Sequence, residues 1–338
     1  MKKKDSISTI KKVINKSSQI TIVTHWSPDG DAMGSSLALY HYLRKLKKKV
    51  KVVVPNDYPT FLNWLPANKT VLNFQKNTTS AKKFVSSSDL IFILDFNTLS
   101  RIDQLGDEVN SNKSAQIIMV DHHQQPDDFA DYYFHDTAAC STCELVYQLI
   151  VGVSGKQAID KKIASCLYTG IMTDTGNFRF NSVTSETHKI VSVLIEKGAD
   201  NSAIYSAVQD NFSFSRIRLI GYCLSEKLKL VPGLNAAYIC LTQKEQDRFN
   251  FVKGDTENLV NFALSISGMK LSAFFTERDG IIKISFRSKG SFDVNLFARK
   301  HWEGGGHKNA AGGQFKKSMD ECESKFVSDI REYSKQLS

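Results

Sequence analysis

Three short, continuously apolar segments of this chain lead directly into residues that can bind a metal ion. The segments are residues 20–24, 90–94 and 116–120, and the residues that follow them are His25, Asp95 and Asp121. Continuous apolar runs are typical of strands buried on both faces of a parallel sheet. Because aspartate is almost never buried without a partner, we expect these side chains to meet at the carboxyl edge of the sheet, where open α/β folds bind ligands.

The segment after the first strand holds three candidate ligands. It reads HWSPDGDAMGSS and carries His25, Asp29 and Asp31 within seven residues, before a helical pattern begins. We interpret Gly30, between the two carboxylates, as the residue that lets their side chains diverge.

Further donors follow later in the chain. His122 and His123 come directly after Asp121, and a helix expected over residues 161–173 ends at Asp174. Carboxylates and imidazoles without thiolates suit Mn²⁺ or a comparable divalent ion better than a structural zinc. These donors are too many for one ion, so the sequence predicts two ions that share a carboxylate. Such a pair lowers the pKa of a bound water and clamps both oxygens of an in-line phosphoryl displacement.

The length of 338 residues favours two domains. The first is expected to be an α/β domain, a parallel sheet with helices on both faces, over residues 1–203. A helical linker is expected over 204–229. Strands near 236–241, 272–276 and 281–286 then predict a smaller α+β domain over 230–338, in which we read the segment EGGGHKNAAGG (303–313) as a loop.

The overall charge and the cysteines give weaker guidance. The formal net charge of +9 favours anionic ligands such as nucleotides or RNA, although solubility alone could account for it. The basic N-terminus lacks the apolar core of a signal peptide, and no apolar run is long enough to span a membrane. Six unevenly spaced cysteines in a chain of this length do not indicate a disulfide framework, so we expect a cytoplasmic protein.

Cys140 and Cys143 have the spacing of a redox pair or of half a zinc site. No second cysteine pair accompanies them, and a helical pattern follows directly. We therefore interpret them as small buried residues at the start of a helix.

Taken together, the motifs resemble those of a known family. The motifs are THWSPDGDAMGS, LDF at Asp95, DHH at 121–123, TDTGNF at Asp174 and GGGHKNAAGG at 304–313. They are similar to the DHH phosphoesterases with a C-terminal DHHA1 domain, in particular the branch that acts as oligoribonuclease and 3′-phosphoadenosine 5′-phosphate (pAp) phosphatase. The resemblance covers nearly the whole chain.

The resemblance implies two ligand sets that share Asp95. They are His25, Asp29 and Asp95 for one Mn²⁺, and Asp31, Asp95, His122 and Asp174 for the other, with Mg²⁺ as a possible substitute. His123 would face the substrate phosphate and assist the leaving group, which makes it a catalytic residue together with Asp95 and Asp31. Asp121 would orient an imidazole.

The resemblance also implies residues that bind the substrate. Arg101 lies where the family carries an arginine, and we leave open whether it is structural or faces a phosphate. The C-terminal domain would hold the bound end of the substrate, since glycines let backbone N–H groups approach an anion and arginine suits bidentate phosphate contacts. The residues concerned there are Arg287, Ser288, Gly304, Gly305, Gly306 and His307.

The expected function is therefore Mn²⁺-dependent hydrolysis of short single-stranded RNA to 5′-mononucleotides and of pAp to AMP. Hydrolysis of linear or cyclic dinucleotide signals is an alternative with the same chemistry. Inorganic pyrophosphatase is disfavoured by the GGGH segment, and a long single-strand exonuclease by the lack of additional domains. A nucleotide-binding regulator with a dead site is disfavoured because every motif carboxylate and imidazole is present. A homodimer is expected only by analogy.

Overall fold

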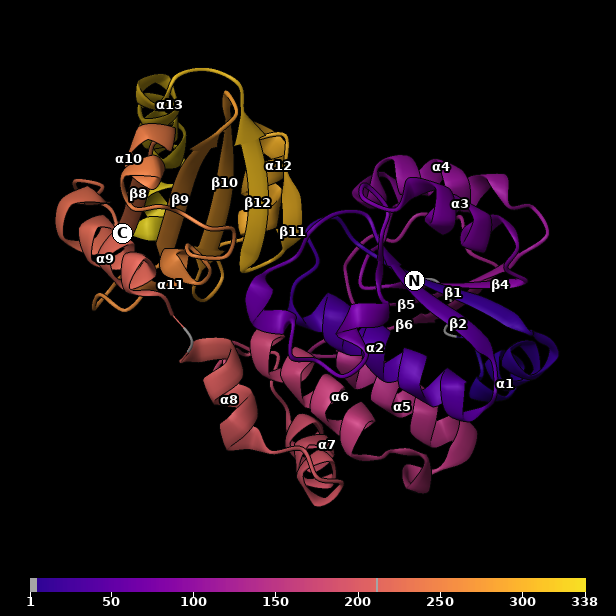
Figure 1. The fold of residues 1–338 in the computed structure, drawn as a ribbon. Coiled ribbons are helices and arrows are strands. Elements are labelled where there is room, and N and C mark those ends of the chain that lie inside the picture. Colours follow the sequence, from indigo (N-terminus) through magenta and orange to yellow (C-terminus); the bar gives the residue numbers. More distant parts are fainter. Residues whose placement is uncertain (1–4, 211) are drawn as a thin grey trace. The chain divides into compact units, whose positions relative to one another are not determined.

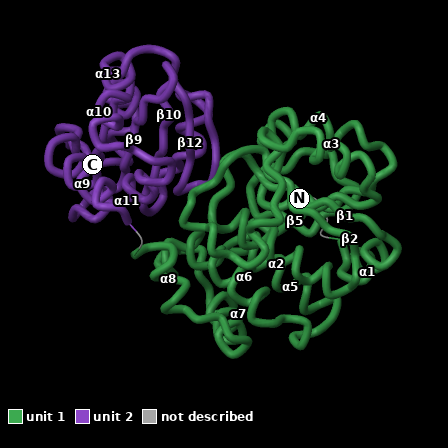
Figure 2. Tube along the Cα trace, viewed as in Figure 1, with its two compact units in different colours: residues 1–211 green, residues 212–338 purple. Residues whose placement is uncertain are grey.

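The computed structural model describes residues 5–210 and 212–338. The chain forms two compact units, residues 1–211 and 212–338 (Figure 2). The helical segment expected to link the domains is divided between them, because α8 (Asn201–Gln209) lies in the first unit and α9 (Phe214–Tyr222) in the second. The limits 1–203, 204–229 and 230–338 therefore do not coincide with the limits of the compact units.

The first unit contains a six-stranded parallel sheet with the order β3-β2-β1-β4-β5-β6. Its strands are β1 (Gln19–Thr24), β2 (Lys49–Val54), β3 (Leu72–Asn73), β4 (Leu90–Leu94), β5 (Gln116–Asp121) and β6 (Tyr132–His135). The strand order reverses direction between β1 and β4. In open α/β sheets this reversal leaves a crevice at the carboxyl ends of the two strands, so the topology places a ligand site after Thr24 and Leu94.

Helices cover both faces of this sheet, as expected for α/β architecture (Figure 1). They are α1 (Ile7–Lys16), α2 (Gly30–Lys45), α3 (Thr78–Ser86), α4 (Gln104–Ser111), α5 (Thr142–Ser154), α6 (Lys161–Asp174), α7 (Ser185–Glu196) and α8. The larger core lies between the sheet and the helices α1, α2 and α5–α8. The smaller core lies beneath α3 and α4 on the other face.

The second unit has a mixed six-stranded sheet with the order β11-β12-β10-β9-β8-β7. Its strands are β7 (Leu228–Leu230), β8 (Ala236–Leu241), β9 (Leu271–Arg278), β10 (Ile281–Ser288), β11 (Gly305–His307) and β12 (Ala310–Phe315). The helices are α9, α10 (Gln243–Arg248), α11 (Leu259–Ala263), α12 (Val294–His301), α13 (Met319–Arg331) and α14 (Ser334–Leu337). One face of the sheet packs on α12 and α13, and α9 and α11 cover β8 and β9 on the other.

The glycine-rich segment 303–313 is not the loop that we expected. Most of it forms the antiparallel pair β11 and β12, in which Gly305 pairs with Gly312. A Cβ atom on Gly304 would lie 1.9 Å from the carbonyl oxygen of Gly312, and one on Gly306 would lie 2.5 Å from that of Ala310. The glycines therefore allow two backbone segments to approach closely, and the alternation that usually marks a strand is absent from their sequence.

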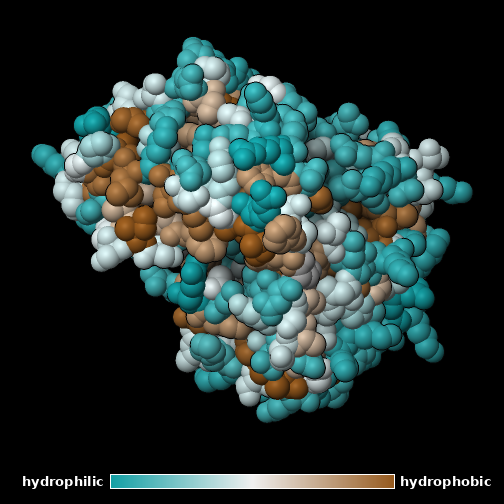
Figure 3. Space-filling model, turned by 60° about the vertical axis from the view of Figure 1, so that its left-hand side comes forward, coloured by the Kyte–Doolittle hydropathy of each residue, from teal (hydrophilic) through white to brown (hydrophobic). Residues whose placement is uncertain are grey.

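All six cysteines are free and buried, and Cys143 lies in the first turn of α5 as expected. Figure 3 shows a mostly hydrophilic face interrupted by separate apolar patches, which is normal for a protein surface. Within residues 5–210 and 212–338, the helices are too short or too polar to cross a membrane.

Glycines also determine how closely α2 and α6 pack. A Cβ atom on Gly34 would lie 2.5 Å from the carbonyl oxygen of Cys166, and one on Gly30 would lie 2.2 Å from Oγ1 of Thr173. The close packing of α2 against α6 thus requires glycine at position 30. This is a separate reason from the divergence of the flanking carboxylates. This approach of two helix backbones brings Asp31 and Asp174, at their respective ends, to the same side of the sheet.

We expect Gly34→Ala to destabilise the first unit by about 1–3 kcal/mol, because the added methyl group meets the backbone of α6. Differential scanning calorimetry would measure this as a lower unfolding temperature. Gly221→Ala in α9 is the matched control, since nothing lies within 4 Å of a Cβ atom there and alanine favours helix. Equal unfolding temperatures for the two variants would contradict the proposed lack of space at Gly34.

Candidate metal centre

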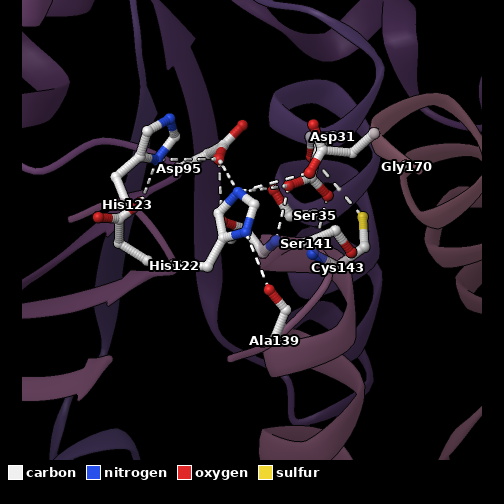
Figure 4. Close-up of polar contacts among 12 residues, drawn as sticks. Asp31, Ser35, Asp95, His122, His123, Ala139, Ser141, Cys143 and Gly170 are labelled. Atoms are coloured by element: carbon white, nitrogen blue, oxygen red, sulfur yellow. Dashed lines mark hydrogen bonds and ion pairs between the residues drawn. The ribbon is translucent and has the colours of Figure 1, made fainter. Parts of the chain in front are cut away.

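The carboxylate of Asp95 lies at the centre of the candidate site. Asp95 follows β4 and has a left-handed backbone conformation (φ 66°), which an aspartate tolerates better than most residues but still at a cost in energy. Its Oδ2 lies 3.5 Å from Nε2 of His25, and its Oδ1 lies 3.6 Å from Nε2 of His122. The two oxygens of one buried carboxylate therefore face two different imidazoles (Figure 4 shows the His122 side).

Two groups of donor atoms here match the expected ligand sets, and a third group, Asp95, Asp121 and His123, shares Asp95 with one of them. In each group the ligand atoms lie within 4.8 Å of one another. One group is His25, Asp29 and Asp95, and the other is Asp31, His122 and Asp174. The motif resemblance implied the same residues as the ligands of two ions, with Asp95 in the second set as well, and their binding of metal stays a prediction.

The described residues fit divalent ions. Nε2 of His122 lies 3.5 Å from Asp174 and 3.9 Å from Asp31, and ligand atoms of an octahedral ion at about 2.1 Å are separated by about 3 Å. A small contraction would bring these atoms to the spacing that ligands have around one ion. Asp31 and Asp95 are only 1% and 2% exposed, and buried carboxylates need opposite charge or hydrogen-bond donors around them, which bound cations would help to supply.

Backbone carbonyl groups set the orientation of the imidazoles. Nδ1 of His25 lies 2.9 Å from the carbonyl oxygen of Trp26, and Nδ1 of His122 lies 3.2 Å from that of Ala139. A carbonyl oxygen only accepts, so each Nδ1 carries the proton and each Nε2 faces the carboxylates. This is the usual way in which a protein fixes a metal-binding tautomer.

His123 is oriented in a different way, by a carboxylate. Its Nδ1 lies 2.7 Å from Oδ1 of the fully buried Asp121, which agrees with the expected role of Asp121. Burial alone would raise the pKa of Asp121, but the adjacent His123 outweighs burial and lowers it to about 2. Asp121 therefore stays anionic and keeps the proton of His123 on Nδ1.

The charges of the site favour cations strongly. Burial lowers the pKa of His25, but the facing carboxylates of Asp29 and Asp95 outweigh it and raise this pKa to about 10. In the same way burial lowers the pKa of His122, and Asp174, Asp95 and Asp31 raise it to about 9. Burial, with repulsion from Asp95 and Asp174, raises the pKa of Asp31 well above its ordinary value. Without metal ions, protons take the place of the missing positive charge.

Sequence reasoning missed one part of the site, the N-terminus of α5. The backbone N–H groups of Thr142 and Cys143 donate to the two oxygens of Asp31 at 2.6 and 2.9 Å. The hydroxyl group of Thr142 donates to Oδ1 of Asp95 at 3.0 Å. The only signal in the sequence is that a helix begins near Cys140, and nothing in the sequence states which carboxylate this helix faces.

A left-handed turn follows Asp174. Gly176, Asn177 and Phe178 have φ values of 58°, 62° and 64°, a conformation that costs about 1–2 kcal/mol for each non-glycine residue. Phe178 is held by ring contacts with Tyr168 and His188, and its N–H group donates to Oγ1 of Thr175. Packing therefore stabilises a strained turn directly beside a candidate ligand.

Arg101 lies at the edge of this region. Its carbonyl oxygen accepts a hydrogen bond from the N–H group of Trp26 at 2.8 Å. Its side chain lines an open pocket of about 360 Å³ together with Trp26, Ser100 and Asp103. The residue thus holds the loop after β1 through its backbone, and both expected roles of Arg101, structural and phosphate-facing, stay open predictions.

In the second unit, the candidate substrate residues lie on neighbouring strands. Arg287 on β10 and His307 on β11 both pair with Ala310 of β12. Paired residues project from the same face of a sheet, and Phe286, which is buried against α12 and α13, marks the opposite face. Arg287 and His307 therefore project from one face, with β12 between them. Ser288 is buried, and its hydroxyl group donates to the carbonyl oxygen of Phe292 at 2.7 Å.

Comparisons with known proteins show the family to which this chain belongs. A family model described as DHH family, N-terminal domain matches residues 19–171, and one described as DHHA1 domain matches residues 235–336. A Thermus thermophilus protein named bifunctional oligoribonuclease and PAP phosphatase NrnA is 30% identical over 316 residues, which cover 93% of this chain and 89% of that protein. The chain belongs to the DHH family of phosphoesterases. It is therefore a hydrolase, and the resemblance stated from its motifs is confirmed.

Two further proteins match this chain over nearly its whole length. The Bacillus subtilis protein with the same name as the Thermus relative is 27% identical over 321 residues, which cover 94% of this chain and 95% of the relative. The crystal structure of an exopolyphosphatase-related protein from Bacteroides fragilis has a TM-score of 0.93 and 42% identity, and the match covers 98% of this chain and 97% of that one.

The two donor groups of this DHH protein predict two bound ions per chain. We expect isothermal titration calorimetry of the metal-free protein with Mn²⁺ to give two ions, and Asp174→Asn to reduce this number to one. Asp279→Asn, in the β9–β10 turn of the second unit, is the control and should leave the stoichiometry unchanged. An unaltered stoichiometry in Asp174→Asn would remove Asp174 from the ligand set.

We also expect metal binding to release protons. The pKa values of about 10 for His25 and about 9 for His122 mean that both imidazoles are cationic at pH 7, and a metal ion binds the neutral form. The affinity for Mn²⁺ should therefore increase as the pH rises from 6 toward these values. Calorimetry in two buffers of different ionisation enthalpy would count the protons; equal heats in both buffers would contradict the prediction.

Proposed function

We propose that this chain is a divalent-metal-dependent phosphoesterase that hydrolyses short oligoribonucleotides to 5′-mononucleotides and removes the 3′-phosphate of pAp. The observation that carries the proposal is the orientation of Asp95, whose two oxygens face two separate donor groups. The names of the two relatives that match over most of the chain support the choice of substrates.

The metal ions belong to this proposal. His25, Asp29 and Asp95 would hold one Mn²⁺, and Asp31, Asp95, His122 and Asp174 would hold the other. When bound, two such ions activate a water molecule and neutralise the charge that develops on a phosphoryl group.

The residues of the chain supply the remaining functions. The carboxylates give an anionic site that favours divalent cations, and two of them, Asp31 and Asp95, are shielded from bulk water. His123 donates a hydrogen bond from Nδ1 to Asp121 and can present Nε2 to the substrate. In its doubly protonated form, the Nε2–H group would donate to a phosphate oxygen or pass its proton to the leaving oxygen, which leaves the ring neutral. The carboxylate of Asp121 orients the ring through Nδ1 and stabilises the protonated form from which that transfer would occur.

The second unit would bind the end of the substrate that does not react. Both pAp and a short RNA carry a second phosphate beyond the scissile one. Arg287 and His307 project from the same face of the β10–β12–β11 sheet, and an arginine can contact such a phosphate through two N–H groups. The backbone at Gly304–Gly306 would contribute by close approach rather than by a flexible loop.

The test is a comparison of hydrolysis rates with Mn²⁺ in one buffer. The substrates are RNAs of two to ten residues, pAp, the linear dinucleotide pApA and pyrophosphate. We expect the shortest RNAs and pAp to be hydrolysed fastest. A clear preference for pApA over other dinucleotides would favour the dinucleotide-signal alternative, and no turnover of any phosphoester would refute the proposal.

Asp31→Asn should reduce turnover of both RNA and pAp by at least about 100-fold. Loss of a residue that only orients a metal ligand typically costs 10–100-fold, and Asp31 is proposed as a ligand itself. Asp279→Asn serves again as the control with unchanged turnover. Wild-type rates in Asp31→Asn would show that the metal centre is assigned wrongly.

A further inference from the structure

The first turn of α5 contacts carboxylates from both donor groups. Ser141 is the N-cap of this helix, and its side chain accepts a hydrogen bond from the N–H group of Glu144. The N–H groups of Thr142 and Cys143, the first two residues of the helix, donate to the two oxygens of Asp31. A helix N-terminus favours an anion, and these two donors from α5 fix the plane of the Asp31 carboxylate.

The hydroxyl group of Thr142 contacts the other central carboxylate. It donates to Oδ1 of Asp95 at 3.0 Å, and this is the oxygen that faces His122 at 3.6 Å. The other oxygen, Oδ2, faces His25. A terminal carboxylate torsion has broad minima, so the carboxylate of Asp95 needs an external contact to keep one oxygen on each side.

We propose that Thr142 is a positioning residue that sets the bridging orientation of Asp95 and thereby couples the two metal groups. The inference rests on the proposed function only in taking Asp95 as a shared ligand. Thr142 itself does not need to touch an ion or the substrate, because its effect passes through Asp95.

The geometry supports this role over simple packing. Thr142 is fully buried, and a buried hydroxyl group needs a partner. A threonine in the interior of a helix can donate to the carbonyl group one turn earlier, as Thr169 does to Ser165 at 2.7 Å. Thr142 is the first residue of α5, where no earlier turn of the helix exists, and its hydroxyl group donates across the site to Asp95.

The experiment compares Thr142→Val with Thr142→Ser. Valine keeps the shape of threonine and the backbone N–H group that binds Asp31, but it removes the hydroxyl group, whereas serine keeps the hydroxyl group. Thr169→Val is the matched control, because it removes a fully buried hydroxyl group whose partner is a helix carbonyl group. For each protein, calorimetry gives the affinity and stoichiometry for Mn²⁺, and calorimetric melting gives the stability of the metal-free form.

We expect Thr142→Val to bind Mn²⁺ about 10–100-fold more weakly than the wild type, which is the usual effect of removing a group that orients a ligand. The Mn²⁺ concentration for half-maximal hydrolysis should rise by a similar factor. Thr142→Ser and Thr169→Val should keep the wild-type affinity. Loss of stability in Thr142→Val with unchanged Mn²⁺ affinity would overturn the inference.

The result separates this inference from the proposed function. A wild-type protein that binds two Mn²⁺ ions but hydrolyses neither RNA nor pAp would refute the function, and the affinities of the variants would still decide the role of Thr142. A wild-type protein that binds fewer than two ions would overturn both.

Discussion

The main constraint on the first unit is that several carboxylates are buried together at one edge of its sheet. Asp31, Asp95 and Asp121 are each at most 2% exposed, and such groups destabilise a fold unless opposite charges or hydrogen-bond donors surround them. The chain surrounds each of them differently. Asp121 has His123, Asp31 has the N-terminus of α5, and Asp95 has Thr142 together with imidazoles on both sides. Each part of the site is therefore also required for the stability of the neighbouring parts.

Much of this arrangement could be predicted from the sequence, because parallel strands place their carboxyl ends at the same edge. The apolar runs before His25, Asp95 and Asp121 are β1, β4 and β5, and the helix that ends at Asp174 is α6. The DHH and DHHA1 motifs also identified the family correctly. Predictions were least complete where elements are short or weakly patterned: β3 and β6 have only two and four residues, and the polar helices α3 and α4 were not predicted.

Two other features could not be read from the sequence for physical reasons. The contact of Thr142 with Asp95 joins residues 47 positions apart, and only the packing of α5 beside the sheet brings them together. The glycine-rich segment of the second unit lacks side chains that alternate between two faces, so it resembles a loop, although its backbone pairs as a strand. In both cases the decisive information lies in the approach of backbone segments and not in residue type.

The spread of the candidate ligands along the chain has a consequence for folding. The candidate donors come from the carboxyl ends of β1, β4 and β5, from the start of α2 and from the end of α6. They meet only when these three strands have paired and α6 has packed against α2. A nascent or misfolded chain would hold at most the local set of His25, Asp29 and Asp31. Binding of two ions, as proposed, would therefore come late in folding. It would stabilise only the correctly folded first unit relative to incompletely folded chains.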